Sequence, residues 1–495
     1  MRASLRGRMS TDLKSLQPSN SPAVEDPPSR AMLEMVAVAH VGTLVIFGAW
    51  ALGGNTAWAQ LALSMWGSLS LLISFAALRH ARGFGSEILR TLRWLWPLGL
   101  FNAVIIASSL NASFREVLDG ANTLYVEDHG RLFLPSTARP LLSLQALWFF
   151  DATYLSCFNL ALVVRSRRTL RALLLGVLAN ATLLAVFGTV QKLAGADALF
   201  FGLIKSPQIH FFSTFIYHNH WGAFTVLMTA VALGLVFNFA RRSNGSAHDF
   251  WNSPAPAILV AIALLALSIP LSTSRSCTVL VGLLLFAALL HALILFVRHR
   301  RASHQSLAFP LAGGLLAIAV SGAFAYNLAK PAIETRIAAT RDQLAELRAR
   351  GNLGSRAILY QDTWNMAREK IWFGWGMASY PTAFFHRNTQ EHSSKDGLPM
   401  YFHDAHSDWL QSISEVGFVG TALLGLCALV PLYHRRRSLG ANLLVRYLLA
   451  GCGMLVLYAA IEFPFGNRAV VAAFWMTFFC AVQYSRLDAS SERRA

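Results

Sequence analysis

The chain has 495 residues, of which 55% are hydrophobic and only 14% charged, and its mean hydropathy is +0.46. This composition excludes an ordinary soluble domain and indicates a polytopic membrane protein. The formal net charge of +17 would suggest nucleic-acid binding in a soluble protein, but in a membrane protein most such charge sets the topology. We therefore expect membrane lipids as partners and no nucleic acid.

Residues 1–30 are polar and rich in Ser and Pro, and they lack the shape of a signal peptide. We interpret them as a disordered cytoplasmic tail. The five cysteines lie in or beside apolar runs and form no C-x-x-C pair, which predicts neither a disulfide framework nor a zinc site. They are Cys157, Cys277, Cys427, Cys452 and Cys480.

Apolar runs long enough to cross about 30 Å of hydrocarbon predict an all-α protein with about twelve transmembrane helices. Nine of them fall in 31–327 and three in 409–485, separated by a large outer loop at 328–408 and followed by a cytoplasmic tail at 486–495. The predicted spans are 32–52, 57–78, 92–110, 143–164, 170–190, 219–240, 254–271, 277–297, 307–327, 409–433, 443–461 and 467–484.

The basic residues then sort onto one side of the predicted bundle. The termini and the loops near residues 79–93, 165–171, 241–242, 298–301 and 435–446 hold 25 of the 42 Lys and Arg residues. By the positive-inside rule this side is cytoplasmic, so both termini are cytoplasmic and the loop at 328–408 faces outward. The spans form uneven clusters with no two matching halves, which argues against an inverted-repeat transporter.

The outer loop predicts an amphipathic helix over 331–350, a second helix from Ser355 to Lys370, a turn at 373–376 and a His-rich stretch that leads to His406. Arg356 starts the second helix, and Arg275 lies in a tight turn between two spans. Arginines beside outward-facing helix N-termini suit a diphosphate. Each arginine could instead reach the phosphates of surrounding lipids.

The turn at 213–222 opens the sixth span on the same outer face. His218, Asn219 and His220 could hydrogen-bond to sugar hydroxyls, with Tyr217 and Trp221 as stacking surfaces. The alternative is a set of interfacial aromatics and solvated histidines. The remaining candidates for substrate binding on this side are Lys205, His403, Asp404 and Trp409.

His406 is the candidate base. A helix N-terminus disfavours imidazolium and keeps the ring able to accept a proton, and Asp404 and Asp408 could orient one ring nitrogen. At about 100° per residue, His406, Gly417 and Gly420 are expected near one helical face. His403 and His406 are spaced i, i+3, but no third ligand is fixed by spacing, so we expect no metal site.

These motifs resemble the outer-loop signature of bacterial O-antigen ligases and the related O-antigen polymerases. The string from Ala405 to Gly420 is similar to the family pattern His-Asn-x-Tyr-Leu-Gln…Glu-x-Gly-x-x-Gly, with Ser407 for Asn and Trp409 for Tyr. Ser-Arg-Ser at 274–276 resembles the family's Ser-Arg-Gly turn. Ser355-Arg356 followed by Phe-Gly-Trp-Gly at 373–376 resembles the start of its large loop, and 215–221 is a looser match.

The resemblance implies a metal-independent, inverting glycosyltransferase without a cofactor that uses an undecaprenyl-diphosphate-linked glycan as donor. Arg275 and Arg356 would hold the diphosphate, and His406 would deprotonate or position the acceptor hydroxyl. It also implies transfer on the periplasmic face of a bacterial inner membrane, and we expect a ligase with lipid A–core as acceptor. A polymerase with a second lipid-linked glycan as acceptor is the close alternative, followed by a protein O-oligosaccharyltransferase.

A transporter is the alternative from another class. It would use ionisable residues near the middle of the membrane, for which His40 and Asp151 are the candidates. Both also suit hydrogen bonds between helices.

Overall fold

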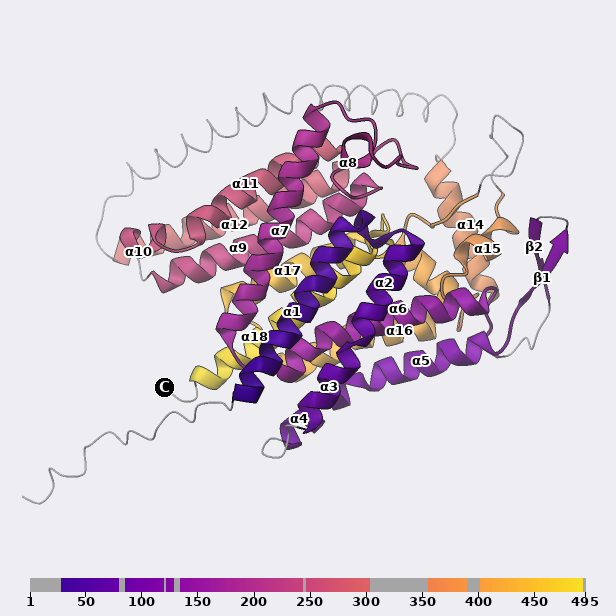
Figure 1. The fold of residues 1–495 in the computed structure, drawn as a ribbon, viewed down its shortest axis with the longest axis horizontal. Coiled ribbons are helices and arrows are strands. Elements are labelled where there is room, and N and C mark those ends of the chain that lie inside the picture. Colours follow the sequence, from indigo (N-terminus) through magenta and orange to yellow (C-terminus); the bar gives the residue numbers. More distant parts are fainter. Residues whose placement is uncertain are drawn as a thin grey trace, which may run out of the picture.

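The computed structural model describes residues 28–79, 85–119, 122–128, 134–243, 246–302, 355–389 and 401–492. Within these ranges the chain forms an elongated helical bundle with one short hairpin at an end (Figure 1). The predicted tail up to residue 27, the span 307–327 and the amphipathic helix 331–350 lie outside the described residues.

The described residues from 28 to 202 contain seven helices of at least eight residues. They are α1 (Pro28–Trp50), α2 (Ala57–Ser68), α3 (Ser70–Arg79), α4 (Gly85–Leu92), α5 (Trp96–Ser109), α6 (Pro140–Val163) and α7 (Arg167–Leu193). The shorter elements are η1 (Leu52–Gly54), η3 (Arg93–Leu95), α8 (Leu199–Gly202) and the strands β1 (Phe114–Asp119) and β2 (Asn122–Glu127).

The chain from residue 218 onward supplies the rest of the bundle and the covering elements beside it. Its helices are α9 (His218–Arg242), α10 (Ala247–Trp251), α11 (Ala255–Ser272), α12 (Arg275–Ala302), α14 (Ser355–Glu369), α15 (Tyr380–Phe385), α16 (Asp408–Arg435), α17 (Leu443–Tyr458), η4 (Pro464–Gly466) and α18 (Arg468–Glu492).

Every predicted span inside the described ranges coincides with helix. Nine of these helical segments are long and apolar enough to cross a membrane. Two predicted spans are shorter than expected, because α5 has 14 residues and α17 has 16. The described residues thus contain a multi-pass set of helices, while the predicted count of twelve is not reached within them.

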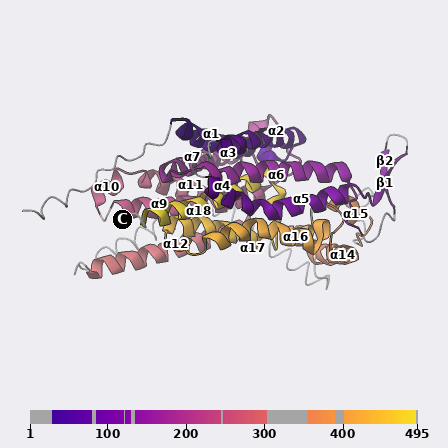
Figure 2. The same cartoon turned by 90° about the horizontal axis from the view of Figure 1, so that it is seen from below.

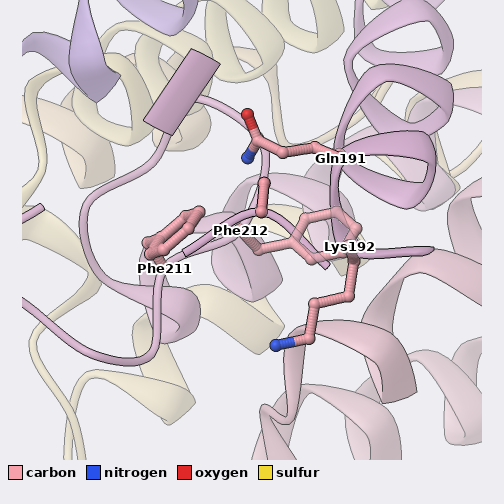
Figure 3. Close-up of a pocket in the computed structure, with 6 residues that line it drawn as sticks. Gln191, Lys192, Phe211 and Phe212 are labelled. Carbon is pink, nitrogen blue, oxygen red and sulfur yellow. The ribbon is translucent and has the colours of Figure 1, made fainter. Parts of the chain in front are cut away.

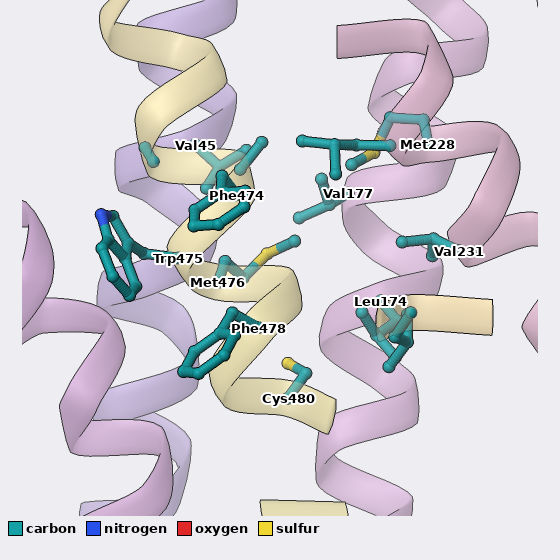
Figure 4. Close-up of a cluster of buried hydrophobic side chains, with 14 of the residues drawn as sticks. Val45, Leu174, Val177, Met228, Val231, Phe474, Trp475, Met476, Phe478 and Cys480 are labelled. Atoms are coloured by element: carbon teal, nitrogen blue, oxygen red, sulfur yellow. The ribbon is translucent and has the colours of Figure 1, made fainter. Parts of the chain in front are cut away.

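The core is built around α18, whose apolar window is 89% buried. Met476 projects from α18 toward Val177 of α7 and Met228 of α9, whereas Phe474 and Phe478 stack on each other on a different face of α18 (Figure 4). Lipid is as apolar as these side chains, so close contact rather than the hydrophobic effect must hold the helices together. Small residues provide it: a Cβ added at Gly451 of α17 would lie 2.5 Å from the Cβ of Ala230 of α9.

A smaller cluster lies beyond one end of the bundle, where α14 and α15 pack under the hairpin (Figures 1 and 2). Strands β1 and β2 pair antiparallel, with Phe114 opposite Glu127. The hairpin departs from the all-α prediction. It is held to the helices by Arg387, which forms ion pairs with Glu127 and Glu369.

The opposite end of the bundle carries paired basic side chains. Arg167 at the start of α7 contacts Asp488 near the end of α18 at 2.6 Å, and Arg165 and Arg486 both contact Glu87. The arginine-rich ends of these helices therefore gather together. The starts of α9, α12 and α16 and the end of α17 lie toward the other end, where α16 packs against α14 and α15 (Figure 1).

Candidate active site

A buried carboxylate, Glu462, is the centre of the polar cluster at this end. It lies in the turn between α17 and α18, and 4% of its side chain is exposed. Its Oε1 accepts a hydrogen bond from Nη2 of Arg356 at 2.6 Å, and its Oε2 lies 3.8 Å from Nδ1 of His406. Two residues predicted to be catalytic therefore meet on one acidic side chain.

The turn that carries Glu462 is fixed against the start of α16. The backbone N–H of Asp408 donates to the Glu462 carbonyl at 3.1 Å. The Asp408 carboxylate accepts from the backbone N–H of Phe465 at 2.8 Å. The indole N–H of Trp409 donates to the Val456 carbonyl in α17 at 2.9 Å. The start of α16 and the turn thus place His406 and Glu462 together.

His406 precedes α16 and has a left-handed backbone, with φ of 52°. Ser407 is the N-cap, and its side chain accepts from the N–H of Leu410 at 3.3 Å. The imidazole packs edge-on against Phe463, with ring centroids 4.9 Å apart. The hydroxyl of Tyr360 donates to the His406 carbonyl at 2.8 Å. These contacts fix both the backbone and the imidazole ring of His406.

The two ring nitrogens of His406 differ in their surroundings. Nδ1 is buried and has no hydrogen-bond partner among the described residues, and Glu462 supplies the carboxylate within 4 Å of it. Neither Asp404 nor Asp408, the flanking carboxylates expected to orient the ring, comes that close within the described part of the chain. The side chain is 31% exposed, so part of the ring is accessible.

The electrostatics of the cluster keep Glu462 ionised. Burial by itself raises the pKa of this carboxyl, because it penalises the charged form. The contacts with His406 and Arg356 outweigh burial and hold the pKa of Glu462 below its usual value. Arg356 is 56% exposed, so much of its guanidinium remains open to a further anion.

The glycines of the motif have a role other than the predicted one. Gly417 does not share a helical face with His406, because it has φ 66° and ψ −175° and interrupts α16. A Cβ at Gly417 would lie 2.2 Å from the carbonyl oxygen of Trp372. The N–H groups that follow Gly417 bond to Ile371 and Trp372. The prediction of one continuous helical face is therefore wrong. The backbone that follows α14 packs against the interruption of α16 at Gly417.

The turn at 373–376 completes this junction. Its N–H groups at Trp375 and Gly376 donate to the carbonyls of Ser414 and Glu415 at 2.9 and 2.7 Å. The Glu415 carboxylate accepts from the N–H groups of Ala378 and Tyr380 at the start of α15. The Glu-x-Gly motif of α16 thus anchors the segment that positions Arg356.

A chain of hydrogen bonds links the predicted anion turn to Glu462. Ser274 donates to Asn219 at 2.7 Å, Asn219 donates to the Tyr217 hydroxyl at 2.8 Å, and that hydroxyl lies 3.5 Å from Oε2 of Glu462. Arg275 follows Ser274 directly and is exposed at the start of α12. The structure therefore brings the Arg275 turn, Arg356 and His406 to the same end of the bundle.

The other predicted substrate-binding residues lie around this cluster with different degrees of access. His220 is buried, with Nε2 3.2 Å from the Phe463 carbonyl, so it supports the turn. His218 lies 3.1 Å from the His210 carbonyl through Nδ1, and exposed His403 packs against Tyr401. Asp404 is half-buried, and burial raises its pKa. Lys205 is exposed in the segment after α8.

A narrow crevice lies apart from these residues, at the end of α7 (Figure 3). It is lined by Gly188, Gln191, Lys192, Ala196, Phe211 and Phe212, and has no room for a water-sized molecule. Gln191 donates to the Ser213 carbonyl at 3.1 Å, which joins two segments of the chain. The crevice is thus part of the packing around the 213–222 turn.

Comparison with known families agrees with the motifs. Residues 260–425 match the family model described as O-Antigen ligase. The family prediction is confirmed over these residues, which include Arg275, Arg356, His406 and Gly417. No curated protein matches the chain.

The O-antigen ligase match ends before Glu462, and the motif-based analysis missed this residue. A usable signal exists in the sequence, because Glu462 is the sole acidic residue between positions 443 and 484. An isolated acid between two apolar helices is costly and is commonly retained for function. Tyr217 and Asn219 also precede the matched segment, so the cluster extends beyond that segment on both sides.

Proposed function

We propose that this protein is a ligase that transfers a polysaccharide from undecaprenyl diphosphate to a hydroxyl of lipid A–core. The meeting of Arg356 and His406 at Glu462 is the observation that carries the proposal. An anion-binding guanidinium and a ring nitrogen open to substrate are the two groups that a displacement at an anomeric carbon needs. The match to the O-antigen ligase family supports this reading.

The reaction is a single inverting displacement. The acceptor oxygen forms a bond to the anomeric carbon as the bond from that carbon to the phosphate oxygen breaks. His406 Nε2 takes the proton of the acceptor hydroxyl. The electron pair of the broken bond leaves with the diphosphate, which the arginines stabilise without a metal ion. Electrostatic stabilisation of such a leaving group can supply several kcal/mol.

Arg356 and Arg275 have complementary places in this scheme. Glu462 binds one Nη group of Arg356, and the exposed remainder of that guanidinium can donate to the phosphate oxygens. Arg275 stands at the N-terminus of α12, where the helix dipole also favours negative charge. Phosphate binding by both arginines would fix the donor beside His406.

The site faces the periplasm in this proposal. The supporting observation is the gathering of Arg167, Arg165 and Arg486 at the end of the bundle away from Glu462. Basic residues prefer the cytoplasmic side of inner-membrane proteins. The lipid-linked donor would approach from the bilayer, with its diphosphate at the depth of the helix ends.

Surface polysaccharide from a deletion strain tests the choice of acceptor. A ligase predicts that long chains disappear from lipid A–core while polymer remains on the lipid carrier. Lipid A–core capped with a single repeat would instead identify a polymerase and refute the ligase. Complementation with the intact gene is the control, and long chains that persist without the gene would refute both.

A further inference from the structure

Glu462 is a buried charged residue, and the transfer reaction described above gives it no role. A carboxylate beside an anionic donor costs electrostatic energy, and its removal from water costs several kcal/mol before its partners compensate. Two basic side chains from distant segments meet its two oxygens. This arrangement suggests that the residue acts on those partners.

We propose that Glu462 is a positioning residue that orients His406 for proton transfer and holds Arg356 at a fixed place beside it. The inference rests on the proposed transfer reaction. The Glu462 carboxylate faces Nδ1 of His406, so that Nε2 is the nitrogen that takes the proton of the acceptor hydroxyl. It does not touch the substrate and acts through its two partners.

The surroundings of the imidazole support this assignment. Nδ1 is buried without a hydrogen-bond partner among the described residues, and Oε2 of Glu462 lies 3.8 Å away. That separation is longer than a hydrogen bond, and catalytic hydrogen bonds commonly shorten when substrate binds. Phe463, next in the chain, packs edge-on against the ring. Adjacent residues of one turn therefore limit both the tilt and the rotation of His406.

The charges change in a favourable direction during the reaction. Before transfer, one carboxylate faces one guanidinium and a neutral imidazole. The proton of the acceptor hydroxyl moves to Nε2, and the imidazolium that forms then faces the Glu462 carboxylate through Nδ1. The carboxylate thus stabilises the charge that develops on the base, as the buried aspartate does in a serine-protease triad.

Several other groups lie around Glu462 and enter any interpretation of its pH dependence. The facing titratable groups from every packed element are Arg356, Tyr360, His406, Asp408, Tyr217, His220, Cys277 and Tyr458. Arg356 brings positive charge to the carboxylate by direct contact, and His406 lies beside its other oxygen. A neutral substitution at 462 therefore alters the charge next to the base.

The test compares E462Q, E462D, H406A and the wild type in proteoliposomes. The deletion strain supplies both probes, undecaprenyl-diphosphate-linked polysaccharide and unsubstituted lipid A–core. D488N is the matched control, because it removes a carboxylate that also contacts an arginine at 2.6 Å, at the opposite end of the bundle. Transfer rates are measured against pH at equal amounts of folded protein.

We expect E462Q to lower kcat by about 100-fold or more, in line with loss of the orienting carboxylate in a catalytic triad. The acidic limb of the pH–rate profile of E462Q should move to lower pH, because the imidazolium of His406 loses its anionic neighbour. E462D keeps the charge and should retain more activity than E462Q, with a limb nearer that of the wild type. D488N should behave like the wild type.

Two results would overturn the positioning role and leave the transfer reaction intact. One is an E462Q rate equal to that of D488N while H406A is inactive. The other is a reduced E462Q rate with an unmoved acidic limb, which would assign Glu462 to folding alone. Full activity of H406A would instead refute the proposed base, and with it the reaction on which this inference rests.

Discussion

Substitution of Gly417 by alanine should loosen the outer elements from the bundle. Gly417 has φ 66° and ψ −175°, a region that only glycine enters readily, so alanine there costs about 1–3 kcal/mol in backbone strain. The new Cβ would also lie 2.2 Å from the Trp372 carbonyl oxygen, and backbone cannot rotate away as a side chain can. Relief of that clash displaces the chain that follows α14.

The displacement also weakens two hydrogen bonds, from the N–H groups of Phe418 and Val419 to Ile371 and Trp372, each worth about 1 kcal/mol. Strain and lost bonds together amount to about 3–5 kcal/mol. G425A is the matched control, because Gly425 lies in the same helix with nothing within 4 Å of an added Cβ. Alanine there should be neutral or slightly stabilising.

Thermal unfolding of the detergent-purified variants measures this difference. G417A should melt several degrees below the wild type and lose transfer activity, because Arg356 depends on the same junction, whereas G425A should match the wild type in both. A G417A protein as stable as G425A would show that the break in α16 carries no strain. A destabilised G417A with unchanged transfer would refute the link between the junction and Arg356.

Three further outcomes are expected. H406A should lower transfer by about 10²–10⁴-fold, the usual contribution of a general base, while membrane levels stay normal; a wild-type rate would exclude that role. R275K should lose most activity in the same assay, because an ammonium cannot donate two parallel hydrogen bonds to phosphate; equal rates would remove Arg275 from the anion site. The third concerns pH and stability. The folded pKa of Glu462 is lowered from its ordinary 4.5, so its stabilisation is present above 4.5 and lost as pH falls through the folded pKa. The melting temperature of the wild type should therefore fall more steeply than that of E462Q below about pH 4.5, and parallel curves would contradict the lowered pKa.

Hydropathy predicted the helices well, because the apolar runs are long and lipid leaves the backbone few alternatives to helix. Hydropathy did not predict that two of the apolar runs are each divided into two helical segments. The run 92–110 is divided into η3 and α5, and 57–78 is divided into α2 and α3 around Leu69. The hairpin at 114–127 was missed because its six-residue strands carry little periodic signal and depend on contacts such as Arg387 with Glu127.

The candidate site was only partly accessible to sequence reasoning. Arg356 and His406 belong to a recognisable motif, and their residue types indicate anion binding and proton transfer. Gly417 was predicted to lie within a regular helix, because nothing in a single sequence distinguishes a glycine inside a helix from one that interrupts it. Glu462 was hidden for another reason: its partners lie more than 50 positions away in the chain, and the pairing exists only once α16 and α18 are packed.

The same packing explains how the site can combine an arginine that binds the donor diphosphate with a histidine that acts as the base. Arg356 belongs to the outer elements, His406 to the entry of α16 and Glu462 to the turn before α18, so no single segment determines their spacing. The turn is fixed to α16 through Asp408, and α14 is fixed to α16 through Gly417 and Glu415. Helix α16 is therefore the common support, and changes along its first three turns should alter anion binding and proton transfer together, whereas changes beyond Gly425 should alter neither.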